Sequence, residues 1–324
     1  MAAEVVSDTV PHQAKPAGHG AGERSEDSGH DRSRQISTAA NGHACKPAVP
    51  SIVPDLERRL TLSIIMAAFN EERTIARAVE EILTSDFPCA IELIVVNDGS
   101  TDRTADLLGE VTDPRVTVFH HDQNRGKGAA LRSAAALASG NYVLPFDADL
   151  EYVIEDVMRM LEPVVKGRCE VVYGVRLFGY NTVYRSYRYA MGNKMLTRIA
   201  NVLFDACLSD LHTCLKLIPI DLLRSIELTE SGFGLDTEIT ASLLRIGVRP
   251  FEVPVSYFGR SHAEGKKITW RDALACIWIL LRVRLSRRSA LIAEHRGVRR
   301  GRDVRTTPGT LTDEVDGEFM HVVG

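Results

Sequence analysis

Short apolar runs alternate with segments of helical periodicity through the first half of the chain, from about residue 60 to residue 150. The runs are nearly continuous, which is typical of parallel strands covered on both faces. They cover residues 62–69, 91–96, 116–119 and 142–146. Between them the spacing predicts helices ending near Leu83, running through Leu107-Leu108, and over 129–138. This alternation with short connections predicts a doubly wound, mostly parallel α/β sheet.

The second half of the chain continues with less regular alternation. We expect helices over 156–165, 181–204, 222–226 and 236–246, and strands over 170–173, 214–218 and 251–255. Residues 256–267 form a polar segment that we interpret as a loop. Trp270, Ala273, Leu274, Ile277, Trp278 and Leu281 then follow at helical spacing, which predicts an amphipathic helix over 270–284.

The two ends of the chain differ from its middle. Residues 1–56 are rich in small and polar residues without a sustained period, and 287–324 begin with many arginines. We expect residues 1–56 to be disordered, 287–324 to form a basic, largely disordered tail, and 57–286 to form a single domain. The first 55 residues contain no apolar core of a signal peptide, and the longest apolar stretch, 273–281, is too short to span a membrane.

The composition excludes several classes of protein. A hydrophobic content of 44% with 25% charged residues is that of an ordinary globular chain. The net charge of −4 gives no reason to expect a nucleic-acid partner. The six cysteines form no Cys-x-x-Cys pair, which argues against a zinc site and for a reducing compartment.

Three carboxylates follow the apolar run at 142–146, at positions Asp147, Asp149 and Glu151. In an open α/β sheet, ligands bind beyond the carboxyl ends of the strands. Alternation along an extended chain would place the three side chains on one side. Such oxygen ligands suit Mg²⁺ or Mn²⁺, whereas a lone Asp-x-Asp is more often a solvated loop.

Two other strand exits carry polar residues. The second strand ends in Asn97-Asp-Gly-Ser-Thr-Asp, which by itself is an ordinary turn before a capped helix. The third is followed by Asn124-Arg-Gly-Lys-Gly at a helix start, where Gly126 and Lys127 are placed to contact an anion.

Together, Ala67-Ala-Phe-Asn-Glu-Glu, the two segments above and the Asp-x-Asp resemble the family-2 glycosyltransferases of the GT-A fold over about residues 61–285. The closest likeness is to the dolichyl- or polyprenyl-phosphate mannose synthases. The resemblance implies a GT-A-like (Rossmann-like) catalytic domain. Its nucleotide-sugar half is 57–150, and its acceptor half, 151–286, includes the C-terminal amphipathic helix.

For the donor, the resemblance places Ala67, Phe69 and Glu71 beside the base and has Asp98 hydrogen-bond it. Many relatives carry Pro and Tyr at the first two positions, so base contacts differ here. Gly126 and Lys127 would meet the diphosphate.

For the metal, the resemblance implies that Asp149 and Glu151 hold Mg²⁺ or Mn²⁺. It also implies that Asp147 faces the nucleotide sugar, and we include Asp147 as a further metal ligand. Arg260 and Lys266 would close over the diphosphate as catalytic cations. This chain has Ala-Glu264-Gly-Lys where the family has Gly-Glu-Ser-Lys.

For the acceptor, the resemblance implies that Arg176, together with Arg185 or Arg188, grips a lipid phosphate, with Asp210 on the same side of the site. Arginine suits this because its planar fork pairs with phosphate oxygens. His212 is either a general base or a structural residue. The second role is favoured because a phosphate acceptor is already ionised.

The expected activity is metal-dependent, inverting transfer of a hexose, with GDP-mannose preferred to UDP-glucose, to a polyprenyl phosphate on the inner face of the cell membrane. A rival is a transferase of the same fold acting on a soluble sugar or glycan, with Asp210 or Asp236 as base. A rival of another class is a non-catalytic nucleotide- or glycan-binding module. The helix at 270–284 would either lie on the bilayer or pack on the core.

Overall fold

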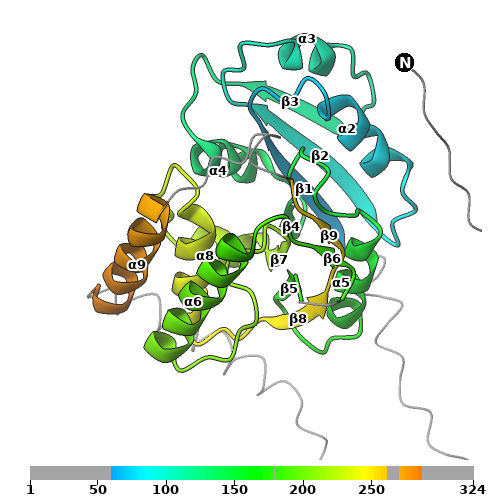
Figure 1. Ribbon diagram of the computed structural model, residues 1–324. Coiled ribbons are helices and arrows are strands. Elements are labelled where there is room, and N and C mark those ends of the chain that lie inside the picture. Colours follow the sequence, from blue (N-terminus) through cyan, green and yellow to red (C-terminus); the bar gives the residue numbers. More distant parts are fainter. Residues whose placement is uncertain (1–59, 178–179, 261–269, 287–324) are drawn as a thin grey trace, which may run out of the picture. The chain divides into compact units, whose positions relative to one another are not determined.

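The computed structural model describes residues 60–177, 180–260 and 270–286, which belong to the unit Pro50–Gly324. Its main sheet has seven strands in the order β3-β2-β1-β4-β7-β5-β8 (Figure 1). Only β7 runs antiparallel to its neighbours, which confirms the prediction of a mostly parallel α/β sheet. The strands are β1 (Thr61–Ala68), β2 (Ala90–Asn97), β3 (Val116–His120), β4 (Tyr142–Pro145), β5 (Val172–Val175), β7 (Lys216–Pro219) and β8 (Phe251–Pro254).

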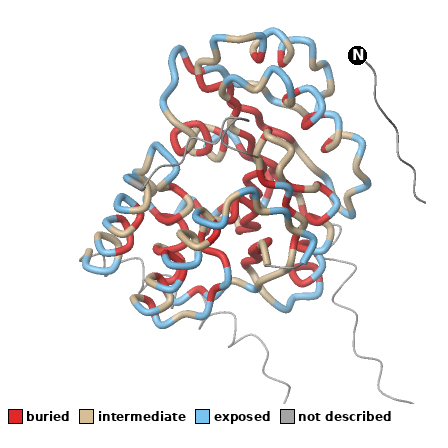
Figure 2. The backbone as a smooth tube through the Cα atoms, viewed as in Figure 1, coloured by how far each residue is buried: buried red, intermediate tan, exposed pale blue. Residues whose placement is uncertain are grey.

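Helices cover both faces of this sheet. They are α2 (Ile75–Thr84), α3 (Thr104–Gly109), α4 (Lys127–Leu137), α5 (Asp156–Val165), α6 (Tyr187–Phe204), α7 (Ile220–Ser225), α8 (Leu235–Arg245) and α9 (Trp270–Leu285). Successive residues of a strand point to opposite faces. Accordingly, Ile64 of β1 packs with α2 and α5 in one buried cluster, and Ile65 packs with α4 and α8 in the other. Figure 2 shows the buried residues concentrated along the interior of the domain.

A third apolar cluster lies between helices and away from the sheet. It joins α6, α8 and α9 through Leu196, Ala200, Leu244, Cys276 and Leu280. No helix in the described part of the chain combines the length and apolar content needed to cross a bilayer.

Two short strands were not foreseen. The helix expected over 181–204 begins only at Tyr187, because Thr182–Val183 form β6. This strand pairs in parallel with β9 (Tyr257–Phe258), inside the segment expected to be a loop. Two-residue strands that pair across the chain leave no periodicity to detect. The expectations for residues 1–56 and 287–324, and for Glu264 and Lys266, lie outside the described residues.

Candidate active site

The segments that follow β1 and β2 are joined by hydrogen bonds between their turn residues. The backbone N–H of Asn70 donates to Ser100 Oγ at 3.0 Å, and Thr101 N donates to Asn70 Oδ1 at 2.9 Å. Glu71 N donates to Thr104 Oγ1 at 2.9 Å. These polar segments therefore build one continuous rim at the carboxyl edge of the sheet, where ligands of such folds bind.

Asp98, at the end of β2, holds the loop that follows β3. It is 2% exposed, and its carboxylate accepts hydrogen bonds from the backbone N–H groups of Arg125 (2.9 Å) and Gly126 (2.8 Å). His121 Nδ1 lies 2.6 Å from the same carboxylate, and no sequence signal pointed to this partner. Asp98 thus positions the glycine loop, and its contact with a base stays a prediction.

The glycine loop is packed against a distant segment. Gly126 has φ +92°, and a Cβ there would lie 2.3 Å from the carbonyl oxygen of Ser231. The same oxygen accepts from Gly128 N (2.7 Å) and Ala129 N (3.3 Å) at the start of α4. These two N–H groups are therefore satisfied by protein, and contact of this loop with an anion stays a prediction.

The acidic triplet lies in a turn beyond β4, so the expected extended alternation is wrong. Leu150 has φ +59°, a left-handed conformation that is strained for leucine and often found at functional sites. Glu151 N donates to Asp149 Oδ1 at 3.1 Å, which closes the turn. The three carboxylates nevertheless stay at one strand exit, and two basic side chains meet them there. The Nζ of Lys127 lies 2.7 Å from Asp147.

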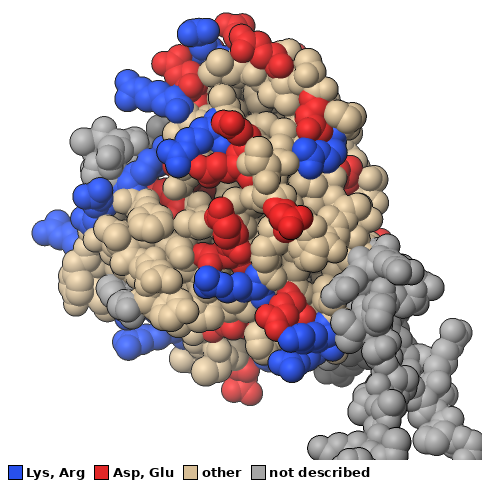
Figure 3. Space-filling view, turned by 90° about the vertical axis from the view of Figure 1, so that its right-hand side faces the viewer, with Lys and Arg blue, Asp and Glu red and all other residues tan. Residues whose placement is uncertain are grey.

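Arg260 is the second basic side chain, and it lies 111 residues after Asp149 in the sequence. Its guanidinium lies 2.9 Å from Asp149, 3.6 Å from Glu151 and 3.5 Å from Glu71. Its backbone N–H donates to Glu151 at 2.7 Å, and the Tyr257 hydroxyl donates to the same carboxylate at 2.6 Å. The face shown in Figure 3 carries acidic side chains gathered near its middle with basic ones beside them.

The charge balance of this turn suits a cation. Burial, and then the like charges of Asp147 and Glu151, raise the pKa of Asp149 to about 7. Negative charge is therefore incompletely compensated, although Arg260 is close. Among the described residues no three such side chains converge as a ready-made metal cage. The oxygen donors nevertheless fit a hard divalent ion.

The residues expected at the acceptor side divide into a buried pair and two exposed arginines. Arg176 Nε and Nη2 donate to Asp210 at 2.6 and 2.9 Å, and Asn193 donates to the same carboxylate at 2.7 Å. Burial alone would raise the pKa of Asp210, but Arg176 holds it well below its usual range. Arg185 and Arg188 are exposed at the start of α6.

The two other candidate bases are also engaged. His212 Nδ1 lies 2.9 Å from Asn193 Oδ1, its Nε2 lies 2.9 Å from Thr237 Oγ1, and burial lowers its pKa to about 4. Asp236 accepts from the fully buried Lys216 at 2.8 Å. Neither side chain is a free base.

The remaining donor-side residues lie along β1 and its exit. Ala67 and Phe69 are partly buried there, and Glu71 accepts from Thr74 Oγ1 at 2.9 Å. Their roles beside a base stay predictions.

A mostly parallel sheet of this order, with acidic and basic side chains meeting beyond β4, is the arrangement of the GT-A fold. The model of the family "Glycosyl transferase family 2" matches residues 63–225, which are 163 of 324 residues. The chain belongs to this family.

Several characterised proteins are similar to the chain. The low-salt glycan biosynthesis hexosyltransferase Agl6 of Haloferax volcanii is 27% identical over 65% of this chain and 52% of its own length. The undecaprenyl-phosphate 4-deoxy-4-formamido-L-arabinose transferase of Pectobacterium carotovorum is 30% identical over 42% of this chain and 43% of its own. The chain thus spans about half the length of these relatives.

A similar fold is seen in the glucosyl-3-phosphoglycerate synthase of Mycobacterium tuberculosis, solved with Mn²⁺, UDP and phosphoglyceric acid. The TM-score is 0.54 at 21% identity, covering 71% of this chain and 80% of that one. This likeness confirms the GT-A fold.

Proposed function

We propose that this protein is a metal-dependent, inverting glycosyltransferase that moves a hexose from a nucleotide sugar to a polyprenyl phosphate at a membrane surface. The observation that carries the proposal is the meeting of three carboxylates with Lys127 and Arg260 at the carboxyl edge of the sheet. The family membership supports the reaction class.

The leaving group explains why both signs of charge are needed. When the glycosidic bond to the nucleotide breaks, negative charge builds up on the departing diphosphate. Preorganised cations stabilise this charge. Lys127 and Arg260 would supply them, while Asp147, Asp149 and Glu151 would hold Mg²⁺ or Mn²⁺. When bound, the metal adds Lewis-acid stabilisation of the same oxygens.

The state of the candidate bases supports a phosphate acceptor over a hydroxyl acceptor. A sugar hydroxyl must lose its proton during transfer, so it needs a base within hydrogen-bond reach. Asp210 and Asp236 are held by Arg176 and Lys216, and His212 is enclosed by hydrogen bonds. A phosphate oxygen attacks without any of them. The name of the Pectobacterium relative, which specifies an undecaprenyl-phosphate substrate, agrees with this choice.

The acceptor phosphate would be met by the exposed arginines Arg185 and Arg188. The guanidinium of Arg176 is committed to Asp210, so we assign it the role of shaping the acceptor side.

The donor stays open between two sugars. The sequence favoured GDP-mannose, whereas the similar Mycobacterium synthase was also solved with UDP-glucose. A donor panel decides between them, and Ala67, Phe69 and Asp98 are the positions to vary for base preference.

The test is transfer from radiolabelled GDP-mannose and UDP-glucose, with Mn²⁺, to a polyprenyl phosphate or to soluble glycans. We expect label in the organic phase with the lipid acceptor, loss of this transfer in Asp149→Asn, and no change in Asp221→Asn, an exposed carboxylate on α7. Transfer only to hydroxyl acceptors, abolished by Asp236→Ala, would replace this proposal by the soluble-acceptor function. Nucleotide binding without turnover on any acceptor would favour a binding module.

A further inference from the structure

Helix α9 carries a stripe of large apolar side chains that the rest of the described chain leaves uncovered. Leu274, Trp278, Leu281 and Leu285 are 57%, 66%, 37% and 76% exposed. Their spacing of four, three and four residues places them on one face of the helix. The opposite side, with Cys276, is buried against α6 and α8.

Helix α6, which contacts α9, has exposed apolar side chains of its own. The two helices lie side by side (Figure 1). Met195 and Val202, seven residues apart on one face of α6, are 50% and 84% exposed. Soluble monomers rarely expose large contiguous apolar patches unless they bind something. We call the following six side chains the α6/α9 face: Met195, Val202, Leu274, Trp278, Leu281 and Leu285.

Basic residues outnumber acidic ones on these two helices. The sequence of α6 contains three basic residues and no acid, and α9 contains three basic residues and one acid, Asp272. The two helices therefore carry six positive charges and one negative, and one of the six, Arg282, is ion-paired with Glu238 and Glu230 of the domain body, whereas the whole chain carries a net −4. Exposed members of the set are Arg188, Lys194, Arg198, Arg271 and Arg284.

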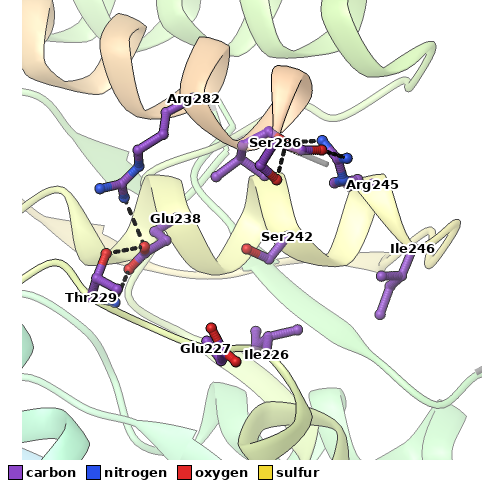
Figure 4. Close-up of a pocket in the computed structure, with 10 residues that line it drawn as sticks. Ile226, Glu227, Thr229, Glu238, Ser242, Arg245, Ile246, Arg282 and Ser286 are labelled. Carbon is purple, nitrogen blue, oxygen red and sulfur yellow. Dashed lines mark hydrogen bonds and ion pairs between the residues drawn. The ribbon is translucent and has the colours of Figure 1, made fainter. Parts of the chain in front are cut away.

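Polar contacts fix α9 to the body of the domain, so its outward side is presented rigidly. Arg282 lies 2.8 Å from Glu238 of α8 and 2.9 Å from Glu230. The guanidinium of Arg245 donates to the backbone carbonyls of Val283 and Ser286, which caps the end of α9. Figure 4 shows the contact of Arg282 with Glu238, and Arg245 beside Ser286, around a pocket between α8 and α9. Most of the polar side chains that line this pocket, among them Glu238, Arg245 and Arg282, are bonded to other lining residues, so the pocket marks where the two helices are joined.

We propose that the α6/α9 face docks the enzyme on an anionic lipid bilayer, a step that deepens the proposed function because a polyprenyl phosphate is presented there. An amphipathic helix lying in the interface buries its apolar stripe among the acyl chains and keeps arginines at the headgroups. Tryptophan is favoured at that depth. The mainly positive rim complements anionic headgroups and repels a second copy of the same face.

The first test follows Trp278 on vesicles, without donor or acceptor. The chain has two tryptophans, so Trp270→Phe leaves Trp278 as the reporter. We expect its emission to shift to the blue on phosphatidylglycerol vesicles, and to be quenched by brominated acyl chains, but not on phosphatidylcholine vesicles. Co-sedimentation with unchanged Trp278 emission would overturn the proposal, because another segment would then carry the binding.

Matched variants give the second test. Leu274→Gln/Leu281→Gln should weaken partitioning onto anionic vesicles at least ~10-fold, since two leucines that the bilayer would bury are lost. Leu137→Gln, on the 45% exposed Leu137 of α4, should have no effect. Equal partitioning of all three proteins would refute the docking face. So would a lipid-free dimer in sedimentation velocity that shields Trp278 from acrylamide.

The outcomes also separate docking from catalysis. Loss of vesicle binding with unchanged turnover on a short-chain, water-soluble polyprenyl phosphate supports docking. Vesicle binding by a protein that transfers no sugar rejects only the proposed function.

Discussion

The partly buried, hydrogen-bonded imidazole of His212 makes a sharp prediction about how stability depends on pH. Its folded-state pKa is about 4, against 6.5 in an unfolded chain, because burial disfavours the charged form. The unfolded state therefore binds the proton first as pH falls. Stability contributed by neutral His212 is complete above about pH 7, declines below about pH 6.5 and is lost near pH 4.

The magnitude follows from the size of the shift. Each pKa unit corresponds to about 1.4 kcal/mol, so the difference between 6.5 and about 4 sets a limit of about 3.4 kcal/mol. Proton-linkage arithmetic for these two values assigns about 2.4 kcal/mol of the loss to the interval between pH 7 and pH 4.5.

The assay compares urea unfolding of the parent and His212→Gln at several pH values. Glutamine keeps a donor for Asn193 and an acceptor for Thr237 but does not titrate in this range. The difference between the two proteins removes the contribution of other groups, including Asp149, whose raised pKa acts in the opposite direction. We expect the advantage of the parent to shrink by about 2 kcal/mol as the pH falls to 4.5. A difference that stays constant, or grows toward acid, would refute the assignment of a neutral, structural imidazole.

Three further predictions test the other parts of the site. Asp210→Asn strands the buried charge of Arg176 and should lower the unfolding free energy by about 3–5 kcal/mol. The double variant Arg176→Met/Asp210→Leu should lose less unfolding free energy than the sum of the losses in Arg176→Met and Asp210→Leu. Additive losses in chemical denaturation would contradict the pairing. Gly126→Ala, at φ +92° in a close contact, should cost at least about 2 kcal/mol and weaken nucleotide binding in calorimetry, whereas Gly167→Ala, at φ +63° in open space, should cost about 1 kcal/mol. Equal costs would show that the contact does not matter. Chelation of divalent ions, or Asp149→Asn, should lower turnover at least ~100-fold with an unchanged circular dichroism spectrum, and full activity in chelator would exclude a metal role.

Local patterns were enough to predict most of the fold. The apolar run of β1 and the helical spacing of α2 concern neighbours in the chain, and hydrophobic periodicity over such distances reports directly which faces are buried. The short connections then favour a right-handed, doubly wound sheet. The acidic triplet was found in the same way, because it directly follows β4.

The sequence did not show which residues from distant segments come into contact. Arg260 reaches Asp149 across 111 residues, and Ser231 caps the start of α4. Neither contact leaves a periodic signal, since each depends on where two surface segments come to lie after the sheet has formed.

Helix α9 illustrates the division between the two kinds of information. Its sequence determined an amphipathic helix, but the helical spacing does not distinguish Ala273 and Ile277 from Leu274 and Trp278, since all four belong to the same apolar pattern. Only the packing of α6 beside α9 decided that the first two are partly covered and the last two exposed. Periodicity marks an apolar face without saying what covers it, because that depends on long-range contacts that a helix cannot encode alone.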